Sequence, residues 1–363
     1  MNELEHKLDR IQSLMRDRQL GALLLRRVSN FAWATCGAAS YVNTATTFGE
    51  SAVLITPGGR HILTNNIEAP RLEQEEQLAA QGWEVHPASW HGTPDEVAAW
   101  TRDLKLGADA PHPGAVDLST EMSHLRADLA PEEGDRFRTL GRLCAEAMEA
   151  AVRSVRPGQS EHQIAGRLAQ ECESRGVQAI VNLVATDERV FRYRHPLPTD
   201  KILERHAMLV LCGRKWGLVG SVTRLAHFGR LTDGLRRKQE AVARVDATLI
   251  ASTRPGRALG DIFRREIATY TDSGWPEEWR LHHQGGPAGY EPREYLATPD
   301  STEIVKTGQA FAWNPSIQGT KSEDTILVGA ASNEVITAMT GWPTIRHLVE
   351  GHEIERPAIL EVG

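Results

Sequence analysis

Residues 209–225 read LVLCGRKWGLVGSVTRL, and this stretch decides the fold of the chain. Two apolar runs rich in Leu and Val flank a short polar segment that ends in a glycine. Apolar runs of this length on either side of a glycine-marked turn are typical of paired strands. We therefore expect strands near 206–213 and 217–225, joined by a tight turn.

Helix and strand patterns alternate through the rest of the chain. Apolar residues at helical spacing predict a helix over 3–18, and a buried strand follows at 21–25. The turn Pro57-Gly58-Gly59 joins a predicted hairpin of strands 51–56 and 61–64. Further helices are expected at 66–80, 94–104, 135–155, 160–175, 232–253 and 259–273, with another strand at 178–185.

Length and local composition predict two domains. A chain of 363 residues exceeds the size at which a single core usually stops growing. Residues 130–135, APEEGD, have the composition of a linker, which separates an α/β domain at 1–130 from a second domain at 131–363. Two helix pairs in the second domain are each hinged on Arg-Pro-Gly, at 156–158 and 254–256, and this repetition indicates an internal duplication.

Three more motifs follow the strand pair in a characteristic order. They are HHQGGPAG at 282–289, Asn314-Pro315, and KSEDT at 321–325. In order and spacing the motifs resemble the creatinase/prolidase/aminopeptidase P family (M24) over nearly the whole chain. The resemblance implies an α+β fold, in which a creatinase-type N-terminal α/β domain precedes a duplicated "pita-bread" domain.

The resemblance also implies where that family binds two divalent cations. The five ligand positions fall on Val210, Ser221, Gly286, Asn314 and Glu323. Tight transition-metal sites need imidazole, thiolate or carboxylate donors, and only Glu323 supplies one. We therefore predict that the chain has no metal centre and needs no other cofactor.

Two residues are candidates for catalysis. The resemblance places His195, in FRYRHPLP at 191–198, at the position of a pocket histidine that transfers protons. Glu323 would orient a substrate N–H or polarise a water. The alternatives are a structural histidine beside Pro196, and a buried salt bridge between Glu323 and Lys321 or Arg293.

The candidates for substrate binding are neutral hydrogen-bonding groups and cations near the former ligand positions. Amide side chains and hydroxyls suit an amide or carboxamide substrate, and arginine binds carboxylates. This set comprises Ser221, His282, Gln284, Arg293, Asn314 and Lys321. Arg192, Arg194 and Arg224 would add positive charge at the mouth of the pocket, unless they are solvated loop residues.

Composition excludes several other classes of protein. A net charge of −7 without a basic run argues against nucleic-acid binding. No apolar run reaches the length of about 18 residues that a membrane span needs. The four cysteines are scattered without a CxxC pair, and no signal peptide is expected, so a reducing cytoplasm is predicted.

These observations lead to one principal hypothesis and two alternatives. The principal hypothesis is a metal-independent hydrolase that cleaves the C–N bond of a small amide or amidine-type substrate or short peptide. The family resemblance implies that it is a homodimer. The first alternative is a metal-dependent Xaa-Pro dipeptidase or aminopeptidase. The second is a non-catalytic binding or scaffold protein on the same fold.

Overall fold

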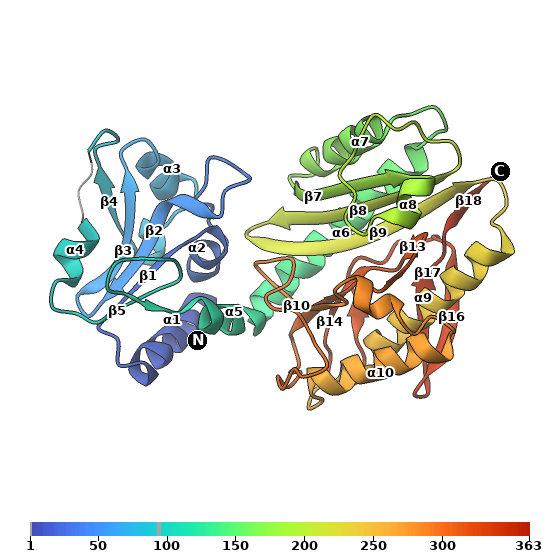
Figure 1. Cartoon of the computed structure of the whole chain (residues 1–363). Helices are drawn as coiled ribbons and strands as arrows, with labels where there is room; N and C mark the ends of the chain where they lie inside the picture. The colour runs from blue at the N-terminus through green and yellow to red at the C-terminus, as the bar shows by residue number, and fades with distance from the viewer. Residues whose placement is uncertain (1, 93–95) are drawn as a thin grey trace. The chain divides into compact units, whose positions relative to one another are not determined.

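The computed structural model describes residues 2–92 and 96–363, and these residues form two compact units (Figure 1). The first unit comprises residues up to 126 together with 130–132 and 216–218. The second comprises 127–129, 133–215 and 219–363.

A six-stranded sheet with the order β4-β3-β2-β1-β5-β6 forms the centre of the first unit. Pairs β1–β2 and β2–β3 are antiparallel, and the remaining pairs are parallel. Leu24, Leu54 and Leu63 contribute to the apolar core against this sheet. The strands are β1 (Ala22–Arg27), β2 (Phe48–Thr56), β3 (Gly59–Asn65), β4 (Glu84–Ala88), β5 (Leu106–Ala108) and β6 (Val116–Asp117). The helices of this part of the chain are α1 (Glu3–Asp17), α2 (Val28–Ala34), α3 (Ala69–Gln74), α4 (Glu96–Thr101) and α5 (Ser119–Ala127).

Two helices in this unit differ from the sequence-based expectation. The helix predicted over 66–80 is shorter, because Asn65 Oδ1 accepts the backbone N–H groups of Ile67 and Glu68 in a turn before α3. Beyond α3, Gln77 adopts a left-handed φ of 52°, which ends the helical path. Of the helix predicted over 94–104, residues 94–95 lie outside the described residues.

Helix α6 (Pro131–Ser154) begins inside the segment predicted as a linker. Proline is favoured at the first helical position because its missing N–H would have no partner there. Glu132 and Glu133 follow in the first turn, where carboxylates interact favourably with the helix dipole. Residues 131–135 are therefore the first turn of a helix, so that prediction was wrong locally.

The second unit combines two four-stranded sheets with long helices. Strands β18-β9-β8-β7 form one sheet and β10-β11-β14-β15 the other. Helix α7 packs on β7, and α9 packs against α10 (Figure 1). The helices after α6 are α7 (Glu161–Glu173), α8 (Glu188–Arg192), α9 (Asp233–Ser252) and α10 (Leu259–Asp272). The strands are β7 (Gln178–Thr186), β8 (His206–Lys215), β9 (Leu218–Phe228), β10 (Gly285–Ala288), β11 (Ala310–Trp313), β12 (Ser316–Ile317), β13 (Thr320–Lys321), β14 (Asp324–Leu327), β15 (Glu334–Val335), β16 (Thr344–Val349), β17 (His352–Pro357) and β18 (Leu360–Val362).

The two Arg-Pro-Gly turns confirm the internal duplication. Gly158 and Gly256 have nearly equal left-handed φ angles of 91° and 88°. Each glycine N–H donates to a later strand-like segment, to the carbonyl of Leu203 in the first repeat and of Val305 in the second. The same turn thus joins α6 to α7 and α9 to α10, with the same long-range hydrogen bond.

Candidate active site

Glu323 lies at the centre of a buried cluster of charges in the second unit. The residue stands between β13 and β14 and pairs with Thr223 of β9 through an isolated bridge. Its Oε1 accepts a hydrogen bond from Arg293 Nη2 at 3.0 Å. Its Oε2 lies 2.9 Å from Lys321 Nζ and accepts from Thr223 Oγ1 at 2.5 Å. Both carboxylate oxygens are therefore engaged by neighbouring side chains.

All three charged side chains are withdrawn from solvent. Their exposed fractions are 2% for Glu323, 4% for Lys321 and 8% for Arg293. Burial alone would raise the pKa of Glu323, but the charges of Lys321 and Arg293 and the Thr223 hydroxyl lower it to about 2. The carboxylate is ionised at neutral pH, and the three formal charges sum to +1.

Ser221 of β9 completes this cluster through Arg293. Arg293 Nη1 donates to Ser221 Oγ at 3.1 Å and to the carbonyl of Pro292 at 2.6 Å. Ser221 is fully buried, and its hydroxyl donates to Cys212 Sγ at 3.4 Å. The serine helps to position the guanidinium that pairs with Glu323.

Three imidazoles gather beside these charges. His195 Nε2 and His282 Nε2 are 2.9 Å apart, so one ring must carry a proton and donate it to the other. The rings of His282 and His283 are stacked, with centroids 4.4 Å apart. His283 stands next to His282 in the HHQGG motif but was not among the site residues predicted from the sequence.

The environment favours the neutral form of these rings. Burial and the positive charge of Lys321 lower the pKa of His195 and bring that of His282 to about 2. Burial and Arg293 lower the pKa of His283 to about 4. At neutral pH the three imidazoles are therefore uncharged.

The three imidazoles also have the spacing of metal ligands, since one nitrogen from each lies within 4.8 Å of the others. Imidazole nitrogen suits Zn²⁺, Cu²⁺ and Ni²⁺. The positive charges of Lys321 and Arg293 act on the same rings and would oppose the binding of a dication there.

The remaining family ligand positions supply no site for two cations. Val210 of β8 is buried in an apolar cluster with Leu183, Met208 and Leu225. At Gly286 of β10, a Cβ atom would stand 2.3 Å from the carbonyl oxygen of Tyr295, so a histidine side chain has no room. The protein backbone itself occupies this ligand position.

The two amide side chains near the cluster differ in what they contact. Gln284 accepts from the Tyr270 hydroxyl and donates to the carbonyls of Trp279 and His282, so its amide is fully used. Asn314 is 2% exposed, and its Oδ1 has no hydrogen-bond partner among the residues that the structure describes. An unpaired buried acceptor of this kind is available for a donor on a bound molecule.

Taken together, the donor set does not fit the two divalent ions that the family resemblance implies. The single carboxylate at these positions, Glu323, is already neutralised by Lys321 and Arg293. Adding two dications beside two buried side-chain cations would be electrostatically unfavourable. We derive no chemical step from such ions.

Gly286→Ala should destabilise the protein by about 1–3 kcal/mol, because the added methyl group collides with the backbone of Tyr295 and Ala297. Chemical denaturation of the whole chain measures this change. Gly166→Ala in α7 is the matched control, since a Cβ there meets nothing within 4 Å and helix propensity favours alanine. Equal stability of Gly286→Ala and wild type would contradict the steric argument.

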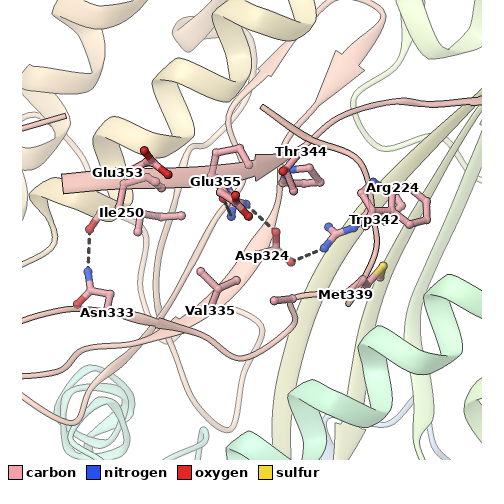
Figure 2. A pocket seen from close by; sticks show the side chains of 14 residues that line it. Arg224, Ile250, Asp324, Asn333, Val335, Met339, Trp342, Thr344, Glu353 and Glu355 are labelled. Atoms are coloured by element: carbon pink, nitrogen blue, oxygen red, sulfur yellow. Dashed lines mark hydrogen bonds and ion pairs between the residues drawn. The ribbon is translucent and has the colours of Figure 1, made fainter. Parts of the chain in front are cut away.

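A second ionic network is centred on Asp324, the residue that follows Glu323 in the chain. Asp324 accepts from Arg224 at 2.9 Å and from Arg356 at 2.6 Å, and Arg356 also pairs with Asp246. Asp324 and Arg224 line a cavity of about 270 Å³. Figure 2 shows Arg224 beside Asp324, with their interaction dashed. The two carboxylates and two guanidiniums balance in formal charge, and their ion pairs link β14 to β9 and β17.

The predicted arginines at the pocket mouth have different surroundings. Arg224 is 2% exposed and is part of the network with Asp324, so it does not lie at a solvent-facing mouth. Its burial follows from its inward position on β9. Arg194 pairs with Glu278, whereas Arg192 is exposed.

Comparisons with known proteins agree with the observed fold. Residues 135–330, more than half of the chain, match the sequence profile of metallopeptidase family M24. The chain superposes on a prolidase from Pyrococcus horikoshii with a TM-score of 0.79 and 18% identity, covering 92% of this chain and 98% of that one. It superposes on an Xaa-Pro dipeptidase from Bacillus anthracis with a TM-score of 0.79 and 19% identity, covering 99% of this chain and all of that one.

A relative in sequence is an uncharacterized peptidase of Staphylococcus saprophyticus, 22% identical over 237 residues. The match covers 61% of this chain and 65% of that protein, slightly less than two thirds of its length. Together with the profile match, this relative supports a hydrolase of the peptidase type. The mixed α/β fold and the ordered motifs place the chain in the same group: it belongs to metallopeptidase family M24.

Proposed function

We propose that the chain hydrolyses a C–N bond of a small amide or amidine-type substrate without the two metal ions implied by its family. The observation that supports this proposal is the binding of Glu323 between Lys321 and Arg293. Two side-chain cations bind the one carboxylate at the ligand positions that the family resemblance implies. Positive charge in a buried site can stabilise the oxyanion of a tetrahedral intermediate.

His195 is the proposed acid/base. Its neutral ring would accept a proton from water as the water oxygen bonds to the substrate carbon. When the C–N bond breaks, the same ring would return the proton to the leaving nitrogen. His282 lies 2.9 Å from His195 and would hold its tautomer, and Gln284 would position His282 through a hydrogen bond to its carbonyl.

The other members of the cluster are proposed to bind the substrate. Lys321 and Arg293 would attract a carbonyl or carboxylate oxygen, with Ser221 supporting Arg293. Asn314 Oδ1 would accept a substrate N–H, since no other donor satisfies it. Glu323 acts in this proposal by holding the two cations, because both of its oxygens are already bonded.

An assay of dipeptides and simple amides tests the proposal. The chelator-treated full chain should not hydrolyse Gly-Pro or Ala-Pro at ordinary enzyme rates of roughly 1–10³ s⁻¹, with or without added Mn²⁺ or Co²⁺. It should hydrolyse a member of a panel of amino-acid amides and N-acyl amino acids, and the chelator should not change that rate.

Each alternative function has its own outcome in this assay. Turnover of Xaa-Pro dipeptides that requires Mn²⁺ or Co²⁺ would establish a metal-dependent dipeptidase and overturn the proposal. Absence of turnover on every substrate in both conditions would favour the binding or scaffold protein. The names of the structurally similar prolidases alone do not decide among them, because fold does not determine function.

The site should prefer anionic or neutral ligands to guanidinium cations, because Lys321 and Arg293 outnumber Glu323. Small carboxylates and carboxamides are expected to raise the melting temperature, by a stabilisation of about 2.7 kcal/mol when the ligand is at a hundred times its Kd. Thermal-shift measurements against matched guanidino compounds such as creatine provide the comparison. Stabilisation by creatine and none by carboxylates would reverse the expected charge preference.

A homodimer in a reducing cytoplasm completes the proposal. Buried thiols at Cys144, Cys172 and Cys212 are compatible with such a compartment. In the described part of the chain, no helix is both long and apolar enough to cross a membrane. Size-exclusion chromatography with light scattering would test the dimer.

A further inference from the structure

A second cluster of metal-ligand type lies in the first unit, apart from every residue used above. His61 is on β3, and Glu84 and His86 are on the neighbouring strand β4. The parallel register pairs His61 with Glu84 and Leu63 with His86. Because alternate residues of a strand share a face, Glu84 and His86 project on one side, and His61 meets both.

The three donor atoms form a compact triangle. His61 Nδ1 lies 3.1 Å from His86 Nε2 and 3.4 Å from Glu84 Oε2, and the third side, Glu84 Oε2 to His86 Nε2, is 3.7 Å. Tetrahedral zinc holds nitrogen and oxygen ligands at about 2.0–2.2 Å, which places neighbouring donors roughly 3.3–3.6 Å apart. One side of the observed triangle lies within this range, and the other two lie within about 0.2 Å of it, so small side-chain adjustments would form one face of a zinc tetrahedron.

The surroundings hold the two imidazoles in this orientation. Trp100 meets both rings edge-on, with centroids 4.1 Å from His61 and 4.7 Å from His86. His61 is 3% exposed, and its other nitrogen, Nε2, lies 3.5 Å from Thr56 Oγ1. A hydrogen-bonding partner on the second nitrogen is the usual support of a metal-bound histidine.

One side of the cluster stays open. The Glu84 side chain is 66% exposed, so an ion has a path of entry and a fourth position for water. The charge also favours a cation here, since a carboxylate faces the two imidazoles. The imidazoles of the second unit face Lys321 and Arg293 instead.

We propose that His61, Glu84 and His86 bind one divalent transition ion, such as Zn²⁺, Co²⁺ or Ni²⁺. The two imidazoles and one carboxylate suit these ions in both donor type and spacing. The ion would tie the edge strand β4 to β3. The site is independent of the proposed hydrolysis, and its presence or absence leaves that proposal unchanged.

Cobalt and zinc titrations of the chelator-treated full chain test this site. One Co²⁺ per chain should bind and produce the visible absorption of tetrahedral cobalt, and Zn²⁺ should displace it in calorimetry. Glu84→Gln and His86→Ala should each weaken Zn²⁺ binding at least tenfold. Zinc should raise the melting temperature of the wild type more than that of either variant.

Two further variants locate the ion. Glu73→Gln, an exposed glutamate of α3, should bind Zn²⁺ as the wild type does. His282→Ala/His283→Ala should also keep the affinity, because it alters only the imidazoles of the second unit. The proposal fails if the wild type binds no ion, if Glu84→Gln binds as tightly as the wild type, or if the double variant loses binding. Glu84→Gln changes an exposed, nearly isosteric side chain, so its result does not depend on the fold tolerating a cavity.

Discussion

Glu323→Gln is expected to lower the free energy of unfolding by about 3–5 kcal/mol, because it leaves two buried cations without their carboxylate. Lys321 and Arg293 are each almost fully buried, so water cannot replace the lost charge. Denaturant unfolding of the whole chain, followed by circular dichroism, measures the change. Glu353→Gln on β17, whose side chain is 63% exposed, is the matched control and should change stability by less than about 0.5 kcal/mol.

The double variant Glu323→Gln/Lys321→Met separates the ion pair from the loss of a hydrogen bond. Replacing Lys321 removes one of the two buried cations that Glu323→Gln leaves without a carboxylate. The double variant should therefore be more stable than the sum of the two single changes predicts. Additive effects would show that Glu323 and Lys321 are not coupled. Wild-type stability in Glu323→Gln would exclude the buried ion pair altogether.

Lowering the pH should remove the stabilisation that the ionised Glu323 carboxylate provides. The pKa of Glu323 is lowered from an ordinary value of 4.5 to about 2 in the folded chain, which corresponds to about 3 kcal/mol. Since the folded pKa is the lower one, this contribution is complete above pH 4.5 and declines as the pH falls toward 2. The stability difference between wild type and Glu323→Gln should therefore shrink over that range.

His195→Ala is expected to lower kcat by roughly 10²–10⁴ on a substrate identified in the amide panel, since proton transfer to water and leaving group would be lost. His195 is only partly withdrawn from solvent, so the melting temperature should change little. The measurement is kcat together with the melting temperature for wild type and variant. His352→Ala, an exposed histidine of β17, should retain full activity.

The pH profile distinguishes a catalytic role from a structural one. Burial and Lys321 lower the pKa of His195, so its ring remains a proton acceptor at a pH below its ordinary 6.5. Activity that depends on the neutral ring should persist as the pH falls through 6.5 and decline only at a lower pH. Unchanged kcat in His195→Ala would reject its assignment as the acid/base.

Local sequence signals predicted most of the second unit. Ser160 caps α7 through the N–H of Gln163, and Thr232 caps α9 through that of Leu235. Such caps, and the apolar periodicity of the strands, act within a few residues and can be read directly from the chain. The lack of a ligand atom on the Val210 side chain is likewise visible in the sequence.

The family and the duplicated helix pairs could be predicted from the sequence alone. Which side chains surround Glu323 depends on the tertiary structure. Arg293 and Thr223 bind Glu323 although they lie 30 and 100 residues away from it in the chain. The Tyr295 carbonyl fills the space beside Gly286. In the first unit, the register of β3 and β4 brings His61 to Glu84. Contacts between distant segments depend on strand register and on packing of the whole unit, which no local pattern specifies.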